Sequence, residues 1–137
     1  MATTATITLT SDITGDATNL NSTATLTKAD SNVTGLDQFT GVTTLVFSAA
    51  QSDKNIIAAA DYADTTVAHK VYIRNANTSG TKFVTVDIDS SANEPLGRLY
   101  PGDWCFFPYD GTLDIDIDTS DAGVTVEFAV ISQSAAS

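Results

Sequence analysis

The sequence has few cysteines and few basic residues, and each scarcity excludes a class of function. A single cysteine, Cys105, excludes an intrachain disulfide and a multi-cysteine zinc site. Only 6 Lys and Arg oppose 17 Asp and Glu, a formal net charge of −11. Such a surface repels nucleic acid, so DNA or RNA is not an expected partner. The apolar runs fall short of the roughly 18 residues that a membrane helix needs, and the first residues lack the features of a secretory signal, so we expect no membrane association.

Motifs that carry catalysis are also scarce. The sequence contains no G-x-S-x-G element, no glycine-rich phosphate loop and no dinucleotide fingerprint. The only histidine, His69, alternates with apolar residues, which favours a hydrogen-bonded histidine in the core or at an interface. Cys105 stands between Trp104 and Phe106 with no basic neighbour to lower its pKa, so an inert, buried or half-buried thiol is expected. We therefore predict a protein that is not an enzyme and that holds no cofactor and no metal.

The strongest cluster of possible metal ligands consists of Asp114, Asp116 and Asp118, with Asp121 just beyond. Alternate carboxylates on one strand face lie about 6.5–7 Å apart, which is wide for a single Ca²⁺ unless a loop contributes ligands. The spacing does not match an EF-hand loop. We favour a solvated strand face whose charge resists edge-to-edge pairing, and Ca²⁺ binding stays open as the alternative.

Thr and Val are abundant, and several stretches alternate apolar with polar residues, the period of a half-buried strand. The region 48–66 could hold a helical turn, but a strand over 55–59 is preferred. The patterns predict an all-β, antiparallel β-sandwich or jelly roll of about eight strands in a single domain, residues 1–137, in which residues 1–20 could form an extended arm. The expected strands cover residues 1–10, 21–28, 43–47, 55–59, 67–75, 81–89, 113–118 and 124–130.

Two pairs of these strands look like hairpins. Residues 67–75 and 81–89 flank the turn NANTSG, and residues 113–118 and 124–130 flank a second short turn. In the second pair, Leu113, Ile115 and Ile117 are expected to face the core. The last two strands would then close an antiparallel sheet.

An aromatic run precedes the last two strands. Phe106 and Phe107 are consecutive, so on a strand they face opposite sides and one of them points away from the core. We expect a neighbouring subunit or a loop to cover that ring. Stacking on sugar rings, as in a carbohydrate-binding module, is the alternative use of these aromatics. The predicted interface residues are Tyr100, Trp104, Phe106, Phe107 and Tyr109.

The second half of the chain, residues 67–132, contains KVYIRNANTSGTKFVTVDID, then LGRLYPGDWCFFPYDGTLDIDI, then VTVEFAVIS. This pattern resembles small β-sandwich virion proteins of tailed bacteriophages, most closely those of phages that infect marine or freshwater bacteria, cyanophages included. The matching positions are Val71 to Asn75, Leu99, Pro101, Gly102, Asp103, Phe107 and Pro108.

The resemblance implies a structural part of the virion, most often a head decoration or cement protein that binds the outer capsid lattice and stabilises the head. Its partners would be the major capsid protein and further copies of this chain, for which a homotrimer is one arrangement. It would be made in the host cytoplasm and end on the capsid surface. Some similar domains serve instead in the neck, the tail or a fibre, and a glycan-binding module there is the alternative function.

Overall fold

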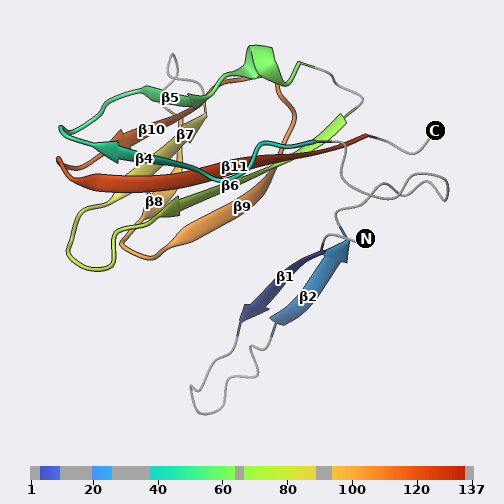
Figure 1. The fold of residues 1–137 in the computed structure, drawn as a ribbon, viewed down its shortest axis with the longest axis horizontal. Coiled ribbons are helices and arrows are strands. Elements are labelled where there is room, and N and C mark those ends of the chain that lie inside the picture. Colours follow the sequence, from blue (N-terminus) through green and yellow to red (C-terminus); the bar gives the residue numbers. More distant parts are fainter. Residues whose placement is uncertain (1–3, 10–19, 26–37, 64–66, 89–93, 135–137) are drawn as a thin grey trace.

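The computed structural model describes residues 4–9, 20–25, 38–63, 67–88 and 94–134, and almost every element in these ranges is a strand (Figure 1). The one helical element within them is a short 3-10 turn, η1 (Ala59–Asp61). The strands are β1 (Thr4–Leu9), β2 (Leu20–Thr25), β3 (Gln38–Phe39), β4 (Thr43–Phe47), β5 (Lys54–Ile57), β6 (Val67–Asn75), β7 (Val84–Ile88), β8 (Glu94–Leu99), β9 (Trp104–Tyr109), β10 (Ile115–Thr119) and β11 (Val124–Ser134).

Strands β3 to β11 form two antiparallel sheets that pack face to face. One has the order β5-β10-β7-β8, and the other has the order β3-β11-β6-β9, with β4 also paired to β11. If β4 to β11 are numbered 1 to 8 along the chain, the two sheets read 2-7-4-5 and 1-8-3-6. This order is that of a jelly roll, a double-sheet sandwich in which the chain passes repeatedly from one sheet to the other. The predicted all-β sandwich is confirmed, with more strands than the eight expected.

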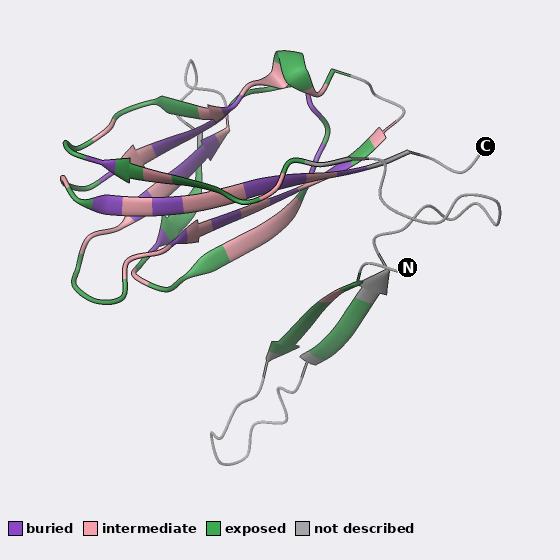
Figure 2. Cartoon of the chain, in the orientation of Figure 1, coloured by how far each residue is buried: buried purple, intermediate pink, exposed green. Residues whose placement is uncertain are grey.

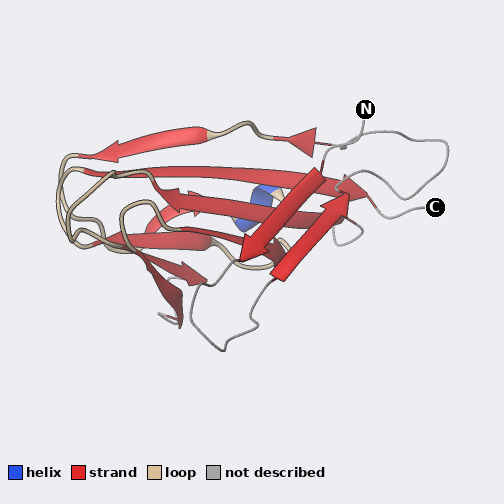
Figure 3. Ribbon diagram, turned by 90° about the horizontal axis from the view of Figure 1, so that it is seen from below, coloured by secondary structure: helices blue, strands red, loops and turns tan. Residues whose placement is uncertain are grey.

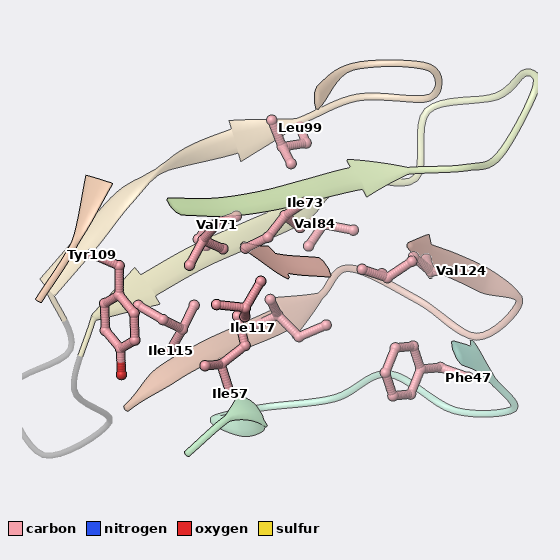
Figure 4. Close-up of a cluster of buried hydrophobic side chains, with 13 residues drawn as sticks. Phe47, Ile57, Val71, Ile73, Val84, Leu99, Tyr109, Ile115, Ile117 and Val124 are labelled. Carbon is pink, nitrogen blue, oxygen red and sulfur yellow. The ribbon is translucent and has the colours of Figure 1, made fainter. Parts of the chain in front are cut away.

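The core is one layer of aliphatic side chains between the two sheets. Along β6, the residues at 69, 71, 73 and 75 are buried, and the residues between them are only partly exposed. Figure 4 shows Val71 and Ile73 pointing from one sheet toward Ile115 and Ile117 of the other, with Tyr109 at one end of the layer. Burying such a side chain contributes about 1.5–3 kcal/mol, so this layer is the main stabilising element.

A buried asparagine fixes the end of β6. Asn75 has no exposed surface, and its Nδ2 donates hydrogen bonds to the carbonyls of Lys82 (3.1 Å) and Leu99 (3.0 Å). Its Oδ1 accepts one from the backbone N–H of Asn77 (3.2 Å). Lys82 leads into β7 and Leu99 ends β8, both in the opposite sheet. The Asn75 amide therefore joins the two sheets where the chain crosses between them.

Both predicted hairpins are wrong, although their strands exist. β6 pairs with β11 and β9, whereas β7 pairs with β10 and β8; β10 and β11 also lie in different sheets. Strands that face each other across a core and strands that lie side by side both turn alternate apolar residues inward, so alternation cannot tell the two arrangements apart. Among the described strands of the sandwich, only β7 and β8 are both consecutive and paired.

Other differences concern the ends and the number of strands. Leu113 was expected in the core, but β10 begins at Ile115 and Leu113 is 44% exposed. The short strand β3 was not predicted. Strands β8 and β9 were not among the expected strands. Pro95 and Gly97, which are unfavourable in a strand, interrupt β8, and β9 is an aromatic run without alternation of apolar and polar residues. The strand preferred over residues 55–59 is confirmed for residues 55–57 by β5, whereas Ala59 begins the 3-10 turn η1.

Strands β1 and β2 form a separate antiparallel ribbon that belongs to neither sheet of the sandwich (Figures 1 and 3). It contains no charged residue, and the hydroxyls of Thr6 and Thr23 are hydrogen-bonded across it (2.9 Å). Figure 2 shows none of its described residues as buried. The strands predicted over residues 1–10 and 21–28 are confirmed by β1 and β2. The loop predicted between them lies outside the described residues, and the single domain over residues 1–137 stays a prediction.

We expect Gly111→Ala to destabilise the sandwich strongly. Gly111 has φ +75°, and a Cβ built there would lie 2.0 Å from the carbonyl oxygen of Tyr62. The matched control is Gly41→Ala, because Gly41 has φ +76° but no atom within 4 Å of its Cβ position. Both variants place an alanine in a left-handed conformation, which costs each of them about 1–2 kcal/mol. The clash with Tyr62 affects Gly111→Ala alone, so this variant should lower the free energy of unfolding in urea by at least about 2 kcal/mol more than the control. Equal losses would show that the Tyr62 contact yields without cost.

Candidate functional site

Aromatic side chains gather on the outer face of the sheet that contains β6 and β9. Phe106 lies directly opposite Tyr72 in the register of these strands, and Trp104 lies opposite Arg74. Trp104 is 50% exposed, and Tyr72 and Phe106 are half-buried. Pro108 extends the row on β9 and is exposed. We call Tyr72, Trp104, Phe106 and Pro108 the aromatic face.

The charge around the aromatic face differs from the charge of the chain as a whole. Among the described residues of β4, β6, β9 and β11 that point outward, one is acidic, Glu127, and two are basic, Lys70 and Arg74. Glu127 pairs with Arg74 at 3.5 Å. In a protein with a net charge of −11, this face can approach another acidic surface with little repulsion.

The five predicted interface residues divide between the outside and the inside of the sandwich. Tyr100 and Trp104 are about half exposed, and Phe106 lies on the outer face. Phe107 packs against the core, and Tyr109 is only 8% exposed and belongs to the core. The expectation that Phe106 and Phe107 face opposite sides is confirmed. The contact proposed for Tyr109 would need an approach through a cavity, since its ring does not reach the outer face.

That cavity, of about 460 Å³, opens at the end of the sandwich where β6 and β9 meet. Burial raises the pKa of the Tyr109 hydroxyl to about 12, so the hydroxyl stays protonated. It donates a hydrogen bond to the carbonyl oxygen of Leu113 (2.6 Å). The ring of Tyr62 stands edge-on to that of His69, with centroids 5.2 Å apart. The lining is mostly apolar and includes Ala68, His69, Ile88, Phe107, Tyr109 and Leu113.

His69 is a buried histidine, as predicted, and its partner is a serine. It lies opposite Ser132 on β11, and its Nδ1 is 2.8 Å from the Ser132 hydroxyl. Both residues are under 5% exposed, and Nε2 of His69 has no hydrogen-bond partner among the described residues. A serine nucleophile needs an accessible hydroxyl and a base that a third group orients. This pair offers neither, so its geometry suits a structural hydrogen bond.

A second cavity, of about 360 Å³, lies between the edge strands of the two sheets, β8 and β9. Cys105 and Phe107 line it from β9, and Val86 and Leu99 line it from the other sheet. Leu96, beside them, is 55% exposed. The predicted half-buried thiol is therefore confirmed, and it lies in an apolar gap along the open side of the sandwich.

The solvated acidic face predicted for Asp114, Asp116 and Asp118 is only partly correct. Asp114 is exposed and Asp118 is half-buried; the carboxylates accept hydrogen bonds from the backbone N–H groups of Ala59 and Asp53, both at 2.8 Å. Asp121 lies 3.7 Å from the Lys82 ammonium. A solvated face is wrong for Asp116, which is 1% exposed, because it lies on the central strand β10 between β5 and β7.

Sequence reasoning missed the partner of Asp116. Asp87 lies directly opposite it on β7 and is also 1% exposed. Burial, followed by the charges of Asp118, Asp53 and Asp116, raises the pKa of Asp87 above its ordinary 3.8. The sequence does contain a sign of this pair, because TVDID in the strand expected over residues 81–89 alternates aspartate with apolar residues as β10 does. Its aspartates were assigned to no cluster, because that strand was paired with residues 67–75.

Within the described ranges, no group of three or more His, Cys, Asp or Glu side chains is arranged to hold a metal ion. In the same part of the chain no helix is long and apolar enough to cross a membrane. The chain matches no protein-family model, and no curated protein is similar to it. The candidate site is therefore defined by its geometry alone, and it consists of the aromatic face.

We expect Cys105 to react slowly with thiol reagents. Burial raises the pKa of its thiol from 9.0 to about 11, and a hydrogen bond from the backbone at Ile73 offsets only part of that rise. At pH 8 the reactive thiolate is then about 100-fold rarer than in an unshifted cysteine. The measurement is the rate of labelling by a disulfide reagent, with urea-unfolded protein as the control. Folded and unfolded rates within tenfold of each other would contradict this.

Proposed function

We propose that this chain is a structural protein of a bacteriophage virion, a capsid decoration or cement protein that binds the outer capsid lattice and stabilises the head without catalysing a reaction. Its partners are the major capsid protein and other copies of itself. The observation that supports this most is the aromatic face: a sheet surface with a half-exposed tryptophan and little acidic charge, on a protein that is otherwise strongly acidic.

The aromatic face has the composition of a protein-binding surface. Trp, Tyr and Arg are the residue types that most often dominate binding energy, and here Trp104, Tyr72 and Arg74 lie on adjacent strands. The sheet beneath them is held by the fully buried residues Val71 and Ile73, so the face is presented on a rigid support. Little ordering entropy is then lost when a partner docks.

Several acidic residues would point away from the lattice. Asp53, Asp114 and Asp118 belong to the sheet β5-β10-β7-β8 or to the segments beside it, on the opposite side of the sandwich from the aromatic face. Each copy needs only a modest interface, because many copies bridging neighbouring capsid subunits add their contributions.

The β1–β2 ribbon suits the same role. A two-stranded sheet is marginally stable in water by itself, and this one is exposed and uncharged, with Ile7 40% exposed. Packing of the ribbon on a neighbouring subunit would supply the apolar contacts that it lacks. It would then act as the arm expected at the start of the chain.

Particles assembled without this protein should form but burst at a lower temperature, and added wild-type protein should restore their stability. Trp104→Ala should weaken binding to such particles at least tenfold, because truncating a central aromatic anchor typically costs about 2 kcal/mol or more. Binding is measured by co-sedimentation, and particle stability by release of the packaged DNA on heating.

The matched control is Leu96→Ala. Leu96 is 55% exposed, as Trp104 is 50% exposed, but it lies on β8 in the other sheet. Both variants should keep the unfolding free energy of the isolated protein within about 1 kcal/mol of wild type. Particles whose bursting temperature is the same with and without the protein would refute the cement role, and equal binding by Trp104→Ala would refute the assignment of the face.

The half-exposed ring of Trp104 also favours a second candidate, a glycan-binding module on a neck, tail or fibre, because exposed aromatic rings stack on sugars. Trp104 is the only tryptophan, so its fluorescence reports on this face directly. Saturable quenching by host surface oligosaccharides, lost in Phe106→Ala, would favour the glycan module over the capsid role. We expect no such quenching.

A further inference from the structure

The aspartates at the centre of the sheet β5-β10-β7-β8 are not explained by binding to a capsid. Asp87 on β7 and Asp116 on β10 lie directly opposite each other, and their neighbours Ile88 and Ile115 are opposite each other in the same register. Directly opposed residues in an antiparallel pair have Cβ atoms about 4.5–5.5 Å apart, so the two side chains leave the same face of the sheet side by side. Each residue is only 1% exposed.

The oxygens of Asp87 lack the contacts that a buried carboxylate needs. Neither Oδ1 nor Oδ2 has a hydrogen-bond partner within the described part of the chain. An isolated carboxylate out of water is costly, and in such a place the group takes a proton instead of remaining charged. A second carboxyl group opposite it adds to this, because two carboxylates at close range cannot both ionise at ordinary cost.

The charges of the described residues around Asp87 do not compensate it. Asp118, also on β10, and Asp53, just before β5, add negative charge. Of the basic residues on the flanking strands, Arg98 lies over the ring of Phe83, 4.4 Å from its centroid, and Lys54 is exposed opposite Ile117. Glu94, at the start of β8, lies opposite Ile88 and not Asp87.

We infer that Asp87 and Asp116 hold one proton between them in the folded protein under conditions in which both would be ionised in the unfolded chain, so that the sandwich is a pH-sensitive element. A proton fits better than a metal ion, because no third ligating side chain of the described residues completes a metal site there. The inference concerns the isolated chain and does not depend on the capsid role.

The sign of the effect follows from proton linkage. The pKa of Asp87 is raised in the folded state, so between its ordinary value of 3.8 and the raised value the folded chain binds more protons than the unfolded chain. The stabilisation is therefore complete below pH 3.8 and is lost as the pH rises through the folded pKa. Above that pH the buried charge destabilises the sheet.

The test compares thermal unfolding of the wild type and Asp87→Asn from pH 4.5 to pH 8, in the presence of a chelator. Asparagine has the shape of a protonated aspartate but does not ionise, so at pH 8 the variant should unfold about 3–6 °C above the wild type. This gap should shrink as the pH falls. The matched control is Asp61→Asn, which removes one charge at an exposed position and should follow the wild-type curve in shape.

A direct measurement on the wild type covers the case in which Asp87→Asn does not fold. Titration of the aspartate carboxyl carbons by NMR should show one midpoint of the pair well above 3.8. A midpoint for Asp87 at or below 3.8, or a gap between the wild type and the variant that does not change with pH, would overturn the inference. So would millimolar Ca²⁺ that raises the unfolding temperature of the wild type but not of the variant, because a cation would then occupy the place of the proton.

Discussion

Two sheets share a single layer of aliphatic side chains, and this constraint determines most of what the protein can do. Each strand of the sandwich turns one face toward Val71, Ile73, Ile115, Ile117 and their neighbours, so only the other face is left for contacts. The layer is thin, and it is closed at one end by the ring of Tyr109 and held by the amide of Asn75 where the chain crosses between sheets. A rigid slab with two outer faces is the result.

The strands and their inward faces could be predicted from the sequence because alternation is a local property. Ile115 and Ile117 were assigned to the core, and both are fully buried. His69 was assigned to a hydrogen-bonded position in the core or at an interface, and Phe106 and Phe107 to opposite sides of a strand, each from period two. Strand partners could not be predicted in this way. β6 and β7 are consecutive and both alternate, yet they face each other across the core, because the jelly roll sends the chain from sheet to sheet.

This error in pairing also hid the opposed aspartates at the centre of the other sheet. With residues 113–118 paired to 124–130, the aspartates of β10 would lie beside Thr125 and Glu127 at a solvated surface. In the actual sheet β10 lies beside β7, and Asp116 lies opposite Asp87. The aromatic face could be predicted more fully, because the consecutive rings at Phe106 and Phe107 require an outward aromatic whichever strand lies beside β9. Tyr72 joined it only through the pairing of β6 with β9.

Position within a sheet explains why the two outer faces differ in character. Trp104 lies on β9, an edge strand, and remains half exposed, so its ring is available to a partner. Asp87 and Asp116 lie on β7 and β10, the two central strands of the other sheet, where neighbouring strands on both sides remove water from a short side chain. An aromatic ring at an edge can be covered by another molecule, whereas a carboxyl group at the centre has to be neutralised within the protein. The same jelly-roll order therefore supplies one face suited to binding and another whose stability depends on a proton.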